Sequence, residues 1–422
     1  MNGWDLAAIA IVIVGYAAFS RPFQTTPLTA PIVFVGCGFV LGSSALDWIH
    51  LGGDSEPVRL LAEVTLTLVL FTDAARIDMT ALRHEYAVPL RLLGIGLPLT
   101  IIAGWALAVV DFSGFSVAEA LVLAVILAPT DAALGQSVVS DERLPSRIRQ
   151  GLNVESGLND GLCVPLLFIA IGLAGTEADA ESTPTAIRVV CEAIGYGVLF
   201  GILAGAIGGL LLRYVKRHNL AEQVWLPAVP VGIAAISYGL ATPPGGSGFI
   251  AAFVAGLTYG TLRRPGEDIA LTEELGGIAS AATFVVFGAA VVGPVLGDLT
   301  WTSVVYGVLS LTAVRMLPVA VALVGTRARL PTVAFVGWFG PRGLASIVFT
   351  VIVLEGSEVP HVHAITVVVV FTVVLSVFAH GLTSKAFTTR YAAWFGRHPD
   401  DAKPTMEAVP AAHQRWRHAA RR

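Results

Sequence analysis

A proline and a carboxylate stand close together inside an apolar stretch at 116–140, where Pro129, Thr130 and Asp131 fall near its middle. Proline has no N–H, and its ring clashes with the carbonyl four residues earlier, so we expect a helix to kink or unwind here. Freed carbonyls and half-helix ends are groups that a dehydrated cation or a proton site can use. The alternative interpretation is a plain proline kink with Asp131 paired to a neighbouring base.

Four polar side chains follow within six residues of the next apolar stretch, at 147–174. In a helix Glu155 and Asn159 stand one turn apart, as do Ser156 and Asp160, so they occupy two adjoining stripes. Hard oxygen ligands suit a small alkali cation better than a soft metal. The predicted ligands are Asp131, Asp160, Ser156 and the Thr130 backbone. The alternative is a polar network that fixes helix packing.

Two arginines lie in later apolar stretches and can compensate the negative charge of these carboxylates. A buried arginine keeps its charge and must be paired. We predict that Glu155 pairs with Arg315, because Arg315 has the greater expected depth. Arg342 follows Gly340 and Pro341, which predict a second broken helix. Arg342 either acts directly or extends its side chain to the cytoplasmic boundary.

Asp73 closes a third apolar stretch, at 57–74, near its expected cytoplasmic end. It either lines a cytoplasmic funnel, where it binds or relays cations, or is a boundary acid beside Arg76. The sequence favours neither interpretation.

The whole chain has the composition of a membrane protein. Of its 422 residues 55% are hydrophobic and 13% charged, and the mean hydropathy is +0.76. So few charges cannot cover a soluble protein of this size. No basic stripe with aromatic residues indicates nucleic-acid binding. The three cysteines lie singly in apolar stretches, which argues against disulfides, and no histidine pair has the spacing of a metal site.

Thirteen apolar stretches are long enough, or nearly so, to cross a bilayer as helices. They are residues 4–20, 28–46, 57–74, 86–110, 116–140, 147–174, 186–213, 222–241, 247–261, 269–293, 299–325, 331–354 and 362–386. We expect the first to be a retained span, since no cleavage signal accompanies it. Glycine-rich runs at 201–209 and 248–260 favour close helix packing.

Lysine and arginine fall in every second connection, so we predict a multi-pass protein of the cell (inner) membrane with the N-terminus outside and the C-terminus in the cytoplasm. Residues 1–390 then form one all-α transmembrane domain, and 391–422 form a short, solvated cytoplasmic tail. The two broken helices are seven stretches apart and therefore opposite in orientation. This pattern predicts an inverted-topology repeat and alternating access in a secondary transporter.

These motifs resemble a known family. APTDAALGQSVV, then RIRQGLNVESGLNDG, the stretch with Arg315 and finally GPRGLAS are similar to the monovalent cation/proton antiporter superfamily. The similarity is to its CPA1 branch, which includes NhaP-type sodium/proton antiporters, and it covers about residues 5 to 390. It implies a homodimer with thirteen spans, a dimerisation half that includes the early spans, and a core half with spans 5, 6 and 12 and two crossed, unwound helices. It also implies the following roles: Asp160 and Asp131 bind the ion with Ser156 and the Thr130 backbone, Asn159 and Thr130 stabilise the crossing, and Glu155 pairs with a buried arginine.

Two positions depart from the family pattern, namely Asp73, where Glu is frequent, and Pro341, where Leu is usual. Asn159 stands where electrogenic relatives carry a second Asp, so we expect electroneutral exchange of one Na⁺ or Li⁺ for one proton, without a cofactor or catalysis. Potassium/proton exchange is the nearest alternative. An intramembrane hydrolase is disfavoured because no Ser/His arrangement is expected within the spans, and a cation channel would lack the inverted broken helices.

Overall fold

The computed structural model describes residues 3–23, 26–51, 55–77, 87–178, 183–263, 269–356, 359–398 and 404–408, and within these ranges every regular element is a helix. The first half contains α1 (Gly3–Phe23), α2 (Ala30–Leu41), α3 (Glu56–Ala75), α5 (Ala87–Arg91), the π-helix η1 (Leu92–Gly96), α6 (Leu97–Asp111), α7 (Val117–Ile126), α8 (Ala132–Val139), α9 (Ser146–Ala178) and α10 (Thr183–Arg217). The second half contains α11 (Ala228–Ala241), α12 (Gly248–Leu262), α13 (Ala270–Val286), the π-helix η2 (Phe287–Val292), α14 (Gly293–Val295), the 3₁₀-helix η3 (Leu296–Asp298), α15 (Trp301–Leu311), α16 (Ala313–Ala322), α17 (Leu330–Trp338), α18 (Leu344–Gly356) and α19 (Val362–Gly396).

Seven helical segments of the described chain are long and apolar enough to cross a membrane, and five apolar helices of 10–17 residues accompany them. The predicted all-α, polytopic fold class is therefore confirmed. The number of thirteen spans stays a prediction.

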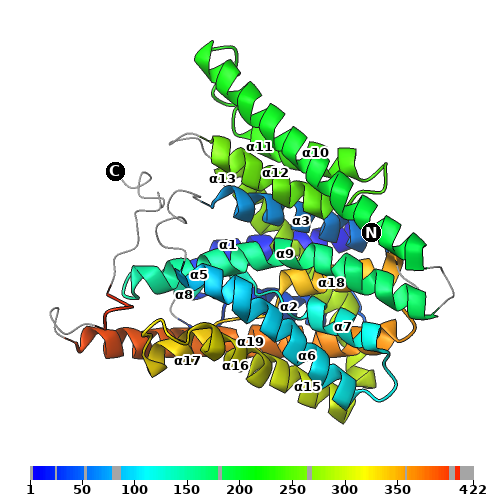
Figure 1. The fold of residues 1–422 in the computed structure, drawn as a ribbon, viewed down its shortest axis with the longest axis vertical. Helices are drawn as coiled ribbons and strands as arrows, with labels where there is room; N and C mark the ends of the chain where they lie inside the picture. The colour runs from blue at the N-terminus through cyan, green and yellow to red at the C-terminus, as the bar shows by residue number, and fades with distance from the viewer. Residues whose placement is uncertain are drawn as a thin grey trace.

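Two predicted stretches unwind over several residues at their prolines, and the stretch at 299–325 has a further break at Thr312, between α15 and α16. The stretch at 116–140 divides into α7 and α8, and the one at 331–354 divides into α17 and α18. The two pairs run in opposite directions and meet near the middle of the bundle (Figure 1). This arrangement places four helix ends within the protein, where their backbone groups need partners.

Helices α3, α10, α11, α12 and α13 form the upper layer of Figure 1, above α9. Glycines permit the close packing of α10 on α12: a Cβ built on Gly201 or Gly205 would lie 2.6 Å from the carbonyl oxygen of Ala251 or Ala255. The close packing predicted for these glycine-rich runs is thus present.

The predicted tail is not solvated throughout. Met406 and Glu407 are only 4% and 2% exposed. Glu407 Oε1 accepts hydrogen bonds from the backbone N–H of Arg329 at 3.0 Å and from the hydroxyl of Thr332 at 2.5 Å. The prediction of a solvated appendage is therefore wrong for residues 404–408, because a buried carboxylate at the start of α17 binds this segment to the membrane domain.

Candidate functional site

The break between α7 and α8 leaves backbone carbonyls without helical partners. Side chains from α18 and from the unwound segment before it, residues 339–343, donate hydrogen bonds to these carbonyls. The helix ends at Ile126 and restarts at Ala132, on either side of Pro129. Ser346 Oγ donates to the carbonyl of Ile126 at 2.8 Å. The guanidinium of Arg342 donates to the carbonyls of Ala128 and Pro129. The freed carbonyls thus bind the other broken helix.

Asp131 connects the two breaks through both its backbone and its carboxylate. Its N–H donates to the carbonyl of Pro341 at 2.7 Å. One carboxylate oxygen accepts from the N–H of Leu134 at 3.1 Å, and the other accepts from the N–H of Leu344 at 2.6 Å. The carboxylate therefore caps the N-termini of α8 and α18 together, where the partial positive charges of both helices favour an anion.

Helix α9 contacts the point where the two breaks, 127–131 and 339–343, meet, which we call the crossing. Ser156 Oγ donates to the carbonyl of Thr130 at 2.7 Å, and Asn159 Nδ2 donates to the hydroxyl of Thr130 at 2.7 Å. Both contacts come from the face of α9 that the residue spacing predicted. Thr130 is thereby fixed between the two half-helices.

Asp160 lies one turn beyond Ser156, and the surroundings of its carboxylate differ from those of Asp131. Asp160 is 5% exposed, and its Oδ1 has no hydrogen-bond partner among the described residues. The carboxylates of Asp131 and Asp73 are close enough to act on it electrostatically. A buried carboxylate without a donor or a counter-charge is costly in its charged form. It is the group of this site best suited to take up a proton or a cation.

The two buried arginines have separate roles. Arg315 donates to both carboxylate oxygens of Glu155, at 2.6 and 2.8 Å, and both residues are 2% exposed. The predicted pairing of Glu155 with Arg315 is therefore present. Arg342 is 0% exposed, so the alternative that it extends to the boundary is wrong. Its guanidinium binds the break of α7–α8 instead.

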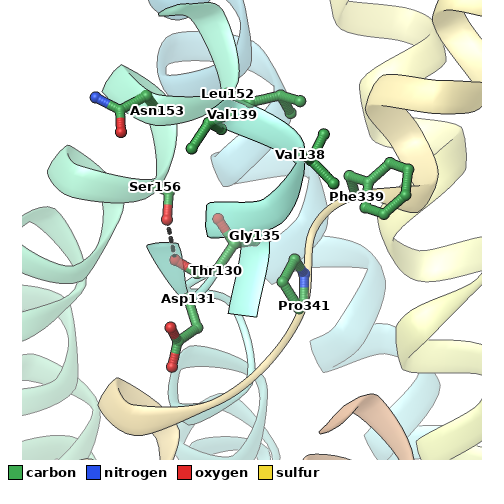
Figure 2. A pocket seen from close by; sticks show the side chains of 10 residues that line it. All are labelled: Thr130, Asp131, Gly135, Val138, Val139, Leu152, Asn153, Ser156, Phe339 and Pro341. Atoms are coloured by element: carbon green, nitrogen blue, oxygen red, sulfur yellow. Dashed lines mark hydrogen bonds between the residues drawn. The ribbon is translucent and has the colours of Figure 1, made fainter. Parts of the chain in front are cut away.

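A small cavity of about 20 Å³ lies against this crossing (Figure 2). It is lined by Thr130, Asp131, Gly135, Val138, Val139, Leu152, Asn153, Ser156, Phe339 and Pro341. The volume is enough for about one water molecule. The lining residues of α8 and α9 lie toward the loop that joins these helices, which carries Arg143. The sequence assigns that loop to the cytoplasmic side.

The comparisons with known proteins agree with this architecture. The model of a family described as "Sodium/hydrogen exchanger, transmembrane" matches residues 8–390. The chain belongs to the sodium/hydrogen exchanger family. A Na(+)/H(+) antiporter of Saccharomyces cerevisiae is 24% identical over 392 residues, which cover 84% of this chain and 39% of that protein. The K(+)/H(+) antiporter NhaP of Alkalimonas amylolytica is 26% identical over 363 residues, which cover 82% of this chain and 60% of that protein. The chain thus spans less than two thirds of either relative.

The fold is also that of a solved antiporter. The sodium proton antiporter MjNhaP1 from Methanocaldococcus jannaschii superposes with a TM-score of 0.73 at 18% identity, over 89% of this chain and 98% of that chain. A second structure of MjNhaP1 superposes with a TM-score of 0.75 at 18% identity, over 94% of this chain and 100% of that chain. This likeness establishes the antiporter fold.

Asp73 lies at the edge of the site in this exchanger-family chain. It packs on α9 at Gly157, where an added Cβ would lie 3.3 Å from that of Asp73. Arg76 is 3.5 Å from the Asp73 carboxylate and also binds Glu273 at 2.6 Å. Asp73 is therefore both beside the predicted ion-binding face of α9 and in a boundary ion-pair network. The pairing with Arg76 fits the boundary-acid interpretation, and the binding or relay of cations by Asp73 stays a prediction.

Sequence reasoning missed four residues that contact the crossing or its cavity. Asn153 precedes Ser156 by one turn on α9, and Ser346 caps α7. Ser376 and His380 bind each other at 3.2 Å inside α19, so the expectation that the spans hold no Ser/His arrangement is wrong. Ser376 accepts the N–H of Arg342 and is fully buried, which leaves it without access to a substrate.

Proposed function

We propose that this chain is a secondary active antiporter that exchanges Na⁺, or Li⁺, for protons by alternating access. The observation that carries the proposal is the Asp160 carboxylate, which is buried beside two crossed broken helices without a hydrogen-bond donor to Oδ1 among the described residues. Its neighbours Asp131, Ser156 and Thr130 bring further carboxylate, hydroxyl and carbonyl oxygens to the crossing. Such oxygens are the ligands that hard cations prefer.

Competition for one carboxylate couples the two ions. The site changes its exposure from one side of the membrane to the other when a cation or a proton neutralises Asp160. The empty, charged site makes this change poorly, because a bare carboxylate is costly in a low dielectric. Transport then requires one ion to leave before the other binds. Exchange should be slow at high proton concentration, where protons occupy the site, and at low proton concentration, where the counter-substrate is scarce.

The stoichiometry that we propose is one to one. Asn159, the neighbour of Asp160, carries no charge, and its amide nitrogen is used in the bond to Thr130. One principal carboxylate then exchanges one positive charge for another. A membrane voltage that drove net sodium movement through the purified protein would contradict electroneutrality.

The test is sodium-driven pH change in proteoliposomes. Asp160→Asn removes the proton-binding group with little change in size and should abolish the signal. The matched control is Asp141→Asn, which changes a carboxylate in the loop between α8 and α9, where Asp141 pairs with Arg143. The control should retain wild-type exchange. Full activity of Asp160→Asn would refute the assignment.

Potassium/proton exchange is the second candidate, because one relative of similar identity is named a K(+)/H(+) antiporter. Oxygen ligands alone do not fix the ion size. Parallel assays with Na⁺, Li⁺ and K⁺ gradients separate the two candidates. A signal with K⁺ alone would replace sodium as the transported ion.

We further propose a homodimer in the cell (inner) membrane, with the N-terminus outside and the C-terminus in the cytoplasm. The alternation of arginine-rich loops supports this orientation. Transport rather than hydrolysis is supported by Ser156, whose hydroxyl donates to a backbone carbonyl and not to a base. Current without ion coupling would favour a channel instead.

A further inference from the structure

We propose that His380 is a positioning residue that fixes both sides of the break between α17 and α18 and thereby holds Asp131 in place. The inference deepens the proposed antiport, since it names a part of the same site that lies outside the ion-binding face. It rests on the hydrogen bonds of α19 to Trp338, at the end of α17, and to Arg342 in the unwound segment 339–343.

The geometry is a chain of three contacts. His380 Nε2 is 2.9 Å from the carbonyl oxygen of Trp338, the last residue of α17. His380 Nδ1 is 3.2 Å from Ser376 Oγ. Ser376 Oγ in turn accepts the backbone N–H of Arg342 at 2.6 Å, at the far end of the break. One imidazole therefore connects the two ends of the unwound segment.

Each ring nitrogen of His380 faces a carbonyl oxygen: Nε2 faces that of Trp338 at 2.9 Å, and Nδ1 faces that of Ser376, one turn back on α19, at 3.0 Å. A hydrogen on Nδ1 would leave the lone pair of Nε2 facing the carbonyl of Trp338, with no donor between them. A hydrogen on Nε2 donates to Trp338 and leaves Nδ1 the hydroxyl of Ser376 as a donor, while the carbonyl of Ser376 lies within the histidine's own helix. We therefore take the tautomer with the hydrogen on Nε2. Nδ1 is then an acceptor, and the hydroxyl of Ser376 is the donor that can meet it. Ser376 Oγ uses its lone pair for the N–H of Arg342 and its hydrogen for His380. A hydroxyl between a donor and an acceptor satisfies every group of the chain.

Burial makes these contacts important. His380 and Ser376 are 1% and 0% exposed, so water is not at hand to replace a lost partner. The ring of Trp338 also lies against the imidazole, with the centroids 5.1 Å apart. A buried N–H or carbonyl that loses its partner is destabilised by more than the net value of one hydrogen bond.

The consequence for the ion site follows from the shortness of the unwound segment. Pro341 accepts the N–H of Asp131, and Leu344 donates to its carboxylate. Both residues lie within two positions of Arg342, whose N–H is held by Ser376. If His380 no longer holds Ser376 and Trp338, the segment gains freedom, and Asp131 loses the fixed positions of one acceptor, the Pro341 carbonyl, and one donor, the Leu344 N–H.

Substitutions separate the two contacts of the ring. His380→Gln places an amide near the position of Nε2 and keeps the Trp338 contact, whereas His380→Asn places one near Nδ1 and keeps the Ser376 contact. His380→Leu removes both. Ser376→Ala removes the acceptor of Arg342 directly. Its matched control is Ser384→Ala, because Ser384 is also buried on α19 but donates only to Gly381 of its own helix.

The first readout is hydrogen–deuterium exchange of the backbone amides at 339–344 in the purified full-length protein. His380→Leu and Ser376→Ala should speed exchange of the Arg342 amide about three- to tenfold, as the loss of one hydrogen bond implies. Gln and Asn at position 380 should give smaller changes, and Ser384→Ala none. Exchange in Ser376→Ala and His380→Leu equal to that of the wild type overturns the inference.

The second readout is the sodium dependence of proton exchange in vesicles. His380→Leu should raise the apparent KM for Na⁺ by more than it lowers the maximal rate, and Gln should restore part of the loss. A lower maximal rate with an unchanged KM in every variant contradicts a positioning role. If the wild type moves no protons in response to cations, the proposed function fails, while the amide exchange still tests His380.

Discussion

The buried pair of Glu155 and Arg315 makes a sharp prediction, because neither charge has solvent to replace its partner. Both side chains are 2% exposed, and the two hydrogen bonds of 2.6 and 2.8 Å form a bidentate contact. Arg315 Nε has no further partner among the described residues. Glu155→Gln removes the negative charge and leaves one weak acceptor for a guanidinium that keeps its charge.

The magnitude follows from the asymmetry of buried ion pairs. Removing one partner of such a pair costs about 3–5 kcal/mol, whereas replacing both by apolar residues of similar volume is often neutral or stabilising. For a chain of 422 residues, 1 kcal/mol corresponds to roughly 1 °C in the unfolding midpoint. Glu155→Gln should therefore lower the midpoint by roughly 3–5 °C. The double variant Glu155→Met with Arg315→Met should recover most of this loss in the unfolding midpoint.

The assay is thermal unfolding of the detergent-purified protein, followed by tryptophan fluorescence at one scan rate because unfolding of a large membrane protein is irreversible. The control is Glu192→Gln, which breaks an exposed pair with Arg188 on α10 and should not shift the midpoint measurably. The reasoning is refuted if Glu155→Gln behaves like Glu192→Gln, or if the double variant is no more stable than Glu155→Gln.

Further substitutions test the crossing, the tail and a loop. A Cβ at Gly343 would overlap the carboxylate of Asp131, so Gly343→Ala should lower antiport at least tenfold in vesicles, whereas Gly36→Ala on α2, with nothing within 4 Å of the new Cβ, should not. Glu407→Ala removes the acceptor of the Arg329 N–H and leaves the Thr332 hydroxyl with Tyr391 as its partner, so the segment 404–408 should become accessible to protease at unchanged overall fold. Hydrogen bonds from Arg143 lower the pKa of Asp141, whose contribution to stability is thus present above the ordinary aspartate pKa and lost as the pH falls through the lowered value. Asp141→Asn should leave the antiport pH profile above about pH 5 unchanged, and a shift there would contradict this role.

Residue spacing predicted the polar face of α9 because a helix repeats every 3.6 residues whatever surrounds it. Ser156 and Asn159 reach Thr130 from that face. The breaks in both interrupted helices were predictable for an equally local reason, since proline removes a donor wherever it stands. The pairing of Glu155 with Arg315 could be predicted from their similar expected depth in the membrane, because a buried charge requires an opposite charge close by.

The partners of the freed backbone were not predictable in this way. A serine in an apolar helix usually bonds within its own helix, as Ser384 does with Gly381. Nothing in the local sequence distinguishes it from Ser376, which binds another segment. The difference arises only when two distant breaks meet. The docking of Glu407 on α17 escaped prediction for the same reason, since it joins segments that are 75 residues apart.

The two central aspartates have unlike surroundings, and this difference bears on the proposed exchange. Both oxygens of Asp131 accept backbone N–H groups at the starts of two helices, an environment that suits a permanent negative charge. Asp160 has no such donor at Oδ1. Asp131 can then keep its charge and hold the crossing together through the transport cycle, while Asp160 alone changes its occupant. On this argument Asp131→Asn should disturb the crossing as well as the ion, since an amide cannot accept from both N–H groups. Asp160→Asn should stop exchange without loosening the crossing, so amide exchange at Leu134 and Leu344 should rise in the first variant and stay at the wild-type rate in the second.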